Sequence, residues 1–105
     1  MKVFRRFITT SVVVMILTAA VHAADQRVQD LYKSKCQGCH GADGKATAIG
    51  KKLGAKDFQD PDVAKLTEAD LAKVTEEGKN KMPAYKGKLT EDQIKALAKY
   101  IKEME

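Results

Sequence analysis

Apolar residues recur at helical spacing in two stretches, one near each end of the chain that follows the first 23 residues. Residues 24–35 form a polar segment with one apolar side, made by Val28, Leu31 and Tyr32, which predicts a short amphipathic helix. Thr90–Gln93 has the sequence of a capping box. The apolar residues behind it keep the i, i+3, i+4, i+7 spacing of a second, longer helix: Ile94, Leu97, Ala98 and Ile101.

The middle of the chain predicts one broken helix between two loops. Asp60–Pro61 has the form of an N-cap followed by a first helical residue. A second capped start follows at Thr67–Asp70, and Gly78 ends that helix. Segments 41–54 and 78–89 are rich in glycine and lysine without periodicity, so both are predicted as loops. No segment alternates like a strand, and the chain is predicted to be all-α.

The first 23 residues have the anatomy of a secretory signal peptide. Three basic residues precede an apolar run over Phe7–Val21, and Val21 and Ala23 supply the small side chains that signal peptidase accepts. We expect cleavage after Ala23, with Ala24 as second choice, which leaves one domain over 24–105 in the periplasm or another exported compartment such as the thylakoid lumen. An uncleaved anchor is the alternative, but the run is short against the ~20 apolar residues of a membrane span.

Removal of this leader changes the composition of the remaining chain. Net charge falls from +5 to +2, and one His, one Phe, three Tyr and no Trp remain. So modest a charge, without aromatic residues between the basic ones, argues against nucleic-acid binding. A small domain with so little apolar bulk often needs a metal, a disulfide or another bound group to hold it together.

The only two cysteines form the motif Cys36-Gln37-Gly38-Cys39-His40. Their spacing puts both thiols on one side of a helical turn, where each can form a thioether with a haem vinyl group, and His40 follows with a nitrogen for iron. In an exported protein this motif is a strong indication of c-type haem attachment. Three alternatives remain. Zinc would need a fourth ligand, a thioredoxin-like pair would need strands around the motif, and a plain disulfide would not explain the histidine.

Methionine is the natural candidate for the second axial ligand of such an iron, because no other histidine remains after residue 23. Met104 continues the apolar face of the last helix and is predicted to pack there. Met82 lies in a loop and has no obvious place in a core. Its neighbour Pro83 stiffens that loop. We therefore predict Met82 as the ligand.

Three stretches together resemble the class I cytochromes c, the small soluble carriers of bacteria and photosynthetic organisms. They are Cys36–Gly41 with Gly44, Gly78 with Lys81–Tyr85, and Leu89–Ile101. The resemblance implies an all-α fold of about three main helices plus short ones around one covalently bound haem c. In that fold the first and last helices cross, so that Tyr32 would meet Leu97 or Tyr100, and one haem edge is exposed.

The sequence departs from the family pattern at three points. Val28 stands where the family often has glycine, which predicts a wider contact between the crossing helices. No proline lies between His40 and Asp60, although many relatives orient the ligand histidine with a proline carbonyl, so the hydrogen-bond partner of His40 is left open. Without tryptophan, Tyr85 is the candidate partner of a haem propionate, or else it packs against the ring.

The resemblance implies a monomeric single-electron carrier, not an enzyme, with Cys36 and Cys39 as thioether attachments and His40 and Met82 as axial ligands. Its partners would be other redox proteins, docking on a lysine-rich rim that belongs to the loops beside the haem: Lys45, Lys51, Lys52, Lys56, Lys79, Lys81, Lys86 and Lys88. The alternative for that rim is ordinary solvated surface.

Two other functions remain open: a haem sensor or peroxidase-like enzyme with an open sixth site, and a subunit held in a respiratory complex.

Overall fold

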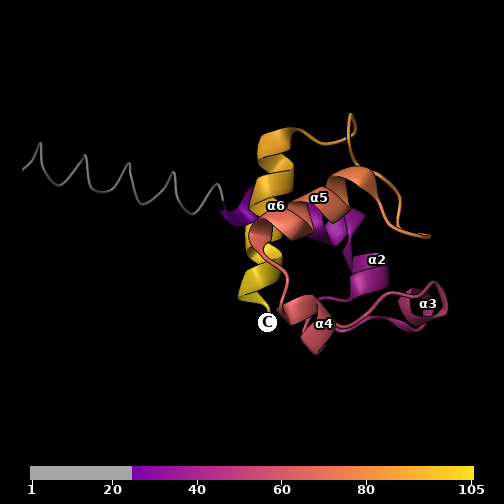
Figure 1. The fold of residues 1–105 in the computed structure, drawn as a ribbon. Coiled ribbons are helices and arrows are strands. Elements are labelled where there is room, and N and C mark those ends of the chain that lie inside the picture. The colour runs from indigo at the N-terminus through magenta and orange to yellow at the C-terminus, as the bar shows by residue number, and fades with distance from the viewer. Residues whose placement is uncertain (1–24) are drawn as a thin grey trace, which may run out of the picture.

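The computed structural model describes residues 25–105, and the predicted signal peptide lies outside them. The described part is helical, without named strands (Figure 1). A first helix occupies residues 25–35. The later helices are α2 (Gln37–His40), α3 (Ala48–Lys52), α4 (Pro61–Ala64), α5 (Glu68–Glu77) and α6 (Glu91–Glu103). The predicted all-α architecture is therefore confirmed.

The core forms where the first helix meets α6. Tyr32 and Leu97 are the two large side chains that are almost fully buried, at 1% and 0% exposure. The rings of Tyr32 and Tyr100 lie edge to face, with centroids 5.3 Å apart. This confirms the predicted meeting of Tyr32 with the last helix, and Val28 packs against the same core.

Both long downstream helices begin with the capping boxes that the sequence predicts. Thr67 accepts the Asp70 N–H, and the Asp70 carboxylate accepts the Thr67 N–H in return, which lowers the pKa of that carboxyl. Thr90 and Gln93 repeat the exchange at α6. Each box satisfies N–H groups that the first turn would otherwise leave without a partner. Helix α5 then packs against α6, as Figure 1 shows.

The prediction of one loop over residues 41–54 is wrong in part, because α3 lies within it. Thr47 caps this short helix by accepting the N–H of Gly50. Helix α3 packs against α2. With only five residues and a glycine in the middle, α3 is too short to show apolar periodicity, and it is stabilised by its cap and its neighbour.

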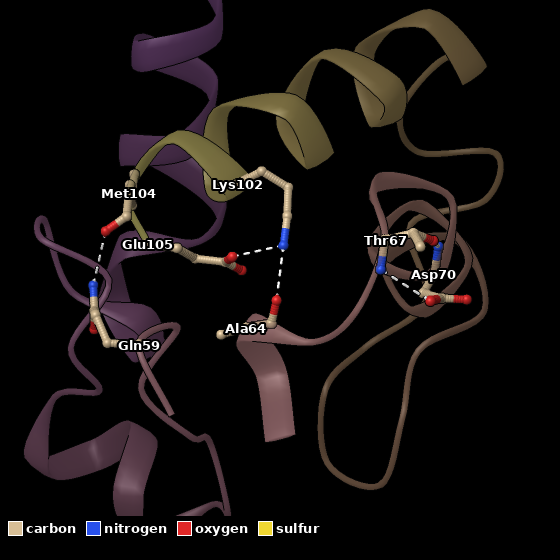
Figure 2. A network of polar contacts seen from close by, with 7 residues as sticks. All are labelled: Gln59, Ala64, Thr67, Asp70, Lys102, Met104 and Glu105. Carbon is tan, nitrogen blue, oxygen red and sulfur yellow. Dashed lines mark hydrogen bonds and ion pairs between the residues drawn. The ribbon is translucent and has the colours of Figure 1, made fainter. Parts of the chain in front are cut away.

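The C-terminus is fastened to the middle of the chain. The Gln59 amide donates to the Met104 carbonyl at 3.0 Å, and Lys102 donates to the Ala64 carbonyl at 2.9 Å and pairs with Glu105 (Figure 2). The Met104 side chain packs against the core, as its helical spacing predicts. Among the described residues, no helix has the length and apolar character of a membrane span.

Candidate functional site

One helical turn carries both cysteines and the histidine. The Cys39 and His40 N–H groups both donate to the Cys36 carbonyl, at 3.3 and 3.0 Å. Both thiols are free and half-buried, with no disulfide between them. Burial raises the pKa of the Cys36 thiol to about 11, unlike the lowered values of redox-active cysteines. Within residues 25–105, no three His, Cys, Asp or Glu side chains gather into a metal-binding group of the kind zinc requires.

Helix α3 and its N-cap contact this turn at the backbone of Gly38 and Cys39. The Thr47 N–H donates to the Cys39 carbonyl at 3.0 Å, and the Thr47 hydroxyl donates to the Gly38 carbonyl at 2.7 Å. A Cβ at Gly50 would overlap the Cys39 carbonyl oxygen. Thr47 and Gly50 are thus site residues that the sequence analysis missed. The sequence signal that could have found them is Thr47, a residue type that often caps a helix, three positions before Gly50.

His40 lies against the ring of Phe58. The ring centroids are 4.9 Å apart and the planes are inclined by 25°. The Nδ1 atom of His40 is buried and has no hydrogen-bond partner among the described residues. Burial lowers the pKa of His40, which favours the neutral imidazole, the form that binds metal ions.

The chain turns sharply after His40, and Tyr32 holds the turn. The Tyr32 hydroxyl donates to the Gly41 carbonyl at 2.6 Å. Gly41 has φ 75°, and a Cβ there would overlap the carbonyl oxygen of Lys45. The core of the helix crossing is thereby linked directly to the residue that follows the histidine.

The Met82 loop is attached to the same region by Tyr85. The Tyr85 hydroxyl donates to the Lys35 carbonyl at 3.0 Å, one residue before Cys36. At the other side of the loop, the Tyr85 N–H donates to Thr75 of α5 at 3.0 Å. The side chain of Met82 is half-buried. The loop that carries Met82 is therefore fixed beside the cysteine motif, and the Tyr85 hydroxyl has a protein partner.

Gly78 permits the close return of this loop to the end of α5. It has φ 75°, and a Cβ there would lie 2.7 Å from the Met82 carbonyl oxygen. An antiparallel bridge joins Lys79 to Met82. The glycine that ends α5 therefore also sets the path of the backbone at Met82.

These residues fit a covalently bound haem. Two free thiols on one turn match two thioether attachments, and the half-buried His40 presents an imidazole whose lowered pKa favours the neutral form that binds metal ions. Among residues 25–105 the large side chains that are almost fully buried are Tyr32 and Leu97, and so small a core is of the kind that a bound group often completes.

All eight lysines of the predicted rim are exposed. Lys56 pairs with Asp62 at 3.1 Å, and Lys88 lies over the Tyr85 ring, 5.9 Å from its centroid. The side-chain ion pairs found within residues 25–105 include no other member of the rim.

Comparison with known proteins gives a consistent result at the level of sequence and fold. Residues 23–101 match the family described as cytochrome c oxidase, cbb3-type, subunit III. A cytochrome c6 from Leptolyngbya boryana is 37% identical over 71 residues, which cover 68% of this chain and 81% of that protein. The solved structure of the KustC0563 c-type cytochrome is 33% identical in sequence and superposes with a TM-score of 0.69. The match covers 73% of this chain and 95% of that chain. A point mutant of that cytochrome superposes with a TM-score of 0.68 at 31% identity, and the match covers 74% of this chain and 98% of the mutant chain.

Proposed function

Because the chain belongs to the class I cytochrome c family and is a monohaem c-type electron carrier, we propose that Cys36 and Cys39 attach the haem and that His40 and Met82 are its axial ligands. The haem supplies one-electron chemistry between ferric and ferrous iron. The protein would hold both ligands in place and perform no catalysis of its own, since its only histidine after residue 23 is assigned to the site.

One observation carries this assignment. The turn from Cys36 to His40 holds two free thiols and ends in a half-buried imidazole. Three further contacts support Met82: the Tyr85 hydrogen bond to Lys35, the Tyr85 hydrogen bond to Thr75, and the close approach of Gly78 to the loop. Met104 is used in the core at the end of α6.

Met82→Ala tests the ligand assignment, with Met104→Ala as the matched control. We expect Met82→Ala to abolish the weak far-red absorption band that marks iron bonded to methionine sulfur, and to lower the reduction potential, because Met ligation raises it. Met104→Ala should keep the band and lose only stability. The visible spectrum of the oxidised protein shows the band, and a redox titration followed by visible absorption measures the potential.

Two outcomes would contradict the assignment. Loss of the band in Met104→Ala alone would move the ligand to the end of α6. A wild-type protein that is high-spin and binds carbon monoxide readily would have an open sixth site, and the sensor or peroxidase-like function would replace the carrier.

We further propose that the exposed lysines of the two loops form a docking surface for acidic faces of redox partners. Lys51 and Lys52 extend from α3, which packs against the cysteine turn, and neither has an ion-pair partner among the described residues. A basic surface beside the exposed haem edge would raise the rate of encounter with anions and acidic proteins. This effect weakens as salt concentration increases.

Ferricyanide oxidation of the reduced protein tests this surface. The rate is expected to fall with ionic strength and to fall further in the double variant Lys51→Gln/Lys52→Gln. The matched control is Lys95→Gln/Lys99→Gln on α6, which changes net charge equally and should have a smaller effect. A rate independent of salt, or equal effects of both pairs, would show that the lysines serve solubility.

We place the carrier in an exported compartment, after cleavage behind Ala23, as a free monomer. The leader pattern and the match of the cytochrome c6 over most of its length support this proposal. The family description names an oxidase subunit, which makes a bound subunit the second candidate. Stable co-purification with membrane proteins would favour that candidate.

A further inference from the structure

We propose that Phe58 is a positioning residue that sets the ring orientation of His40, a role that a hydrogen-bond acceptor has at most metal-binding histidines. The inference rests on the proposed role of His40 as an iron ligand. A ligating histidine normally donates its second ring N–H to a carbonyl, a carboxylate or water, and that bond fixes the ring plane. His40 Nδ1 is buried with no such partner among residues 25–105.

The stacking geometry supplies what the missing hydrogen bond would supply. The His40 and Phe58 rings are nearly parallel, with centroids 4.9 Å apart and an inclination of 25°. Rotation of the imidazole about its Cβ–Cγ bond would drive a ring edge into the face of Phe58. The close contact therefore restricts the rotation that a hydrogen bond at Nδ1 would otherwise restrict.

Phe58 can act in this way because it is itself held firmly. It is 5% exposed, and its backbone N–H donates to the Gly44 carbonyl at 2.8 Å. A Cβ at Gly44, which has φ 80°, would come within 2.8 Å of the Phe58 ring. On another side the Tyr32 ring meets Phe58 at 62°, with centroids 6.5 Å apart.

The aromatic contacts form a continuous series from the ligand to the helix crossing. His40 stacks on Phe58, Phe58 meets Tyr32, and Tyr32 meets Tyr100 of α6. Tyr32 also bonds the carbonyl of Gly41, next to His40. The packing of the first helix on α6 thus fixes the histidine from two directions, through its neighbour's backbone and through its own ring.

A histidine oriented by stacking should differ electronically from one oriented by a hydrogen bond. A hydrogen bond at the second nitrogen raises the basicity of the ligand. Without it the imidazole donates less electron density, which favours ferrous iron and raises the reduction potential. Truncation of the buried Phe58 ring would open space beside the imidazole for water, whose hydrogen bond to Nδ1 would raise the basicity of the ligand.

The test compares Phe58→Leu with Phe58→Tyr in the haem-loaded protein. Leucine keeps an apolar side chain but removes the flat ring, so the hyperfine-shifted NMR signals of the His40 ring should move and the reduction potential should fall. Tyrosine keeps the ring and should preserve both. Leu71→Ala, in the same core at 8% exposure, is the matched control, which should lose stability without moving the His40 signals or the potential.

The outcomes separate this inference from the ligand assignment. Unchanged His40 signals and potential in Phe58→Leu would overturn the positioning role while leaving His40 as the ligand. Absence of hyperfine-shifted His40 signals in the wild type would overturn the ligand assignment, and the inference with it. Should Phe58→Leu fail to fold, the reduced wild type decides, since nuclear Overhauser contacts between the two rings are expected and their absence overturns the stack.

Discussion

Leu97→Ala is expected to destabilise the folded protein by about 2–5 kcal/mol, the range for a fully buried leucine that leaves a cavity. Leu97 is 0% exposed and lies in the core cluster with Tyr32, where α6 meets the first helix. Because small domains have only ~5–15 kcal/mol of stability in total, this loss is a large part of it. Guanidinium unfolding, followed by circular dichroism and haem absorption, measures the change.

The matched control for Leu97→Ala is Ile49→Ala. Ile49 is 65% exposed on α3, so its truncation removes little buried area and should change the free energy of unfolding by less than ~0.5 kcal/mol. Equal losses in the two variants would mean that the helix crossing does not carry the stability of the fold.

Gly50→Ala is expected to cost about 1–3 kcal/mol, as overpacking of a tight contact does. The added methyl group would overlap the Cys39 carbonyl oxygen. Either α3 must move away from the cysteine turn or Cys39 must shift. Since Cys39 carries one of the two thiols, we also expect a lower yield of covalently attached haem, measured by haem staining of denatured protein relative to total protein.

Gly38→Ala is the control for that experiment. Gly38 lies between the two cysteines, and a Cβ there would meet nothing within 4 Å. As a helical position it should tolerate alanine, with a gain of up to ~1 kcal/mol from helix propensity. Full haem attachment in Gly38→Ala with reduced attachment in Gly50→Ala is the expected pair. Identical behaviour would show that α3 does not brace the turn.

The departures from the family pattern gain a physical meaning in the structure. The missing proline after His40 coincides with a buried, unpartnered Nδ1 and a stacked Phe58. Val28, in place of the small residue expected at the crossing, packs against the core while Tyr32 and Tyr100 meet beside it. The fold therefore accepts both changes.

The sequence by itself determined the features that depend on neighbours along the chain. The capping boxes at Thr67 and Thr90 and the stop at Gly78 are local, because a cap and its partner lie within one turn. The turn that brings Cys36 and Cys39 together is local for the same reason. Helical periodicity then identified the buried face of α6, since one face of a helix repeats at a fixed spacing.

Only the tertiary structure decided how the site is held together. The stack of Phe58 on His40 spans 18 positions in sequence, and the bond from Tyr85 to Lys35 spans 50. Helix α3 forms because Thr47 caps it and Gly50 fits against Cys39, neither of which produces a periodic pattern. Contacts between distant residues depend on the path of the whole backbone, and no local propensity encodes that path.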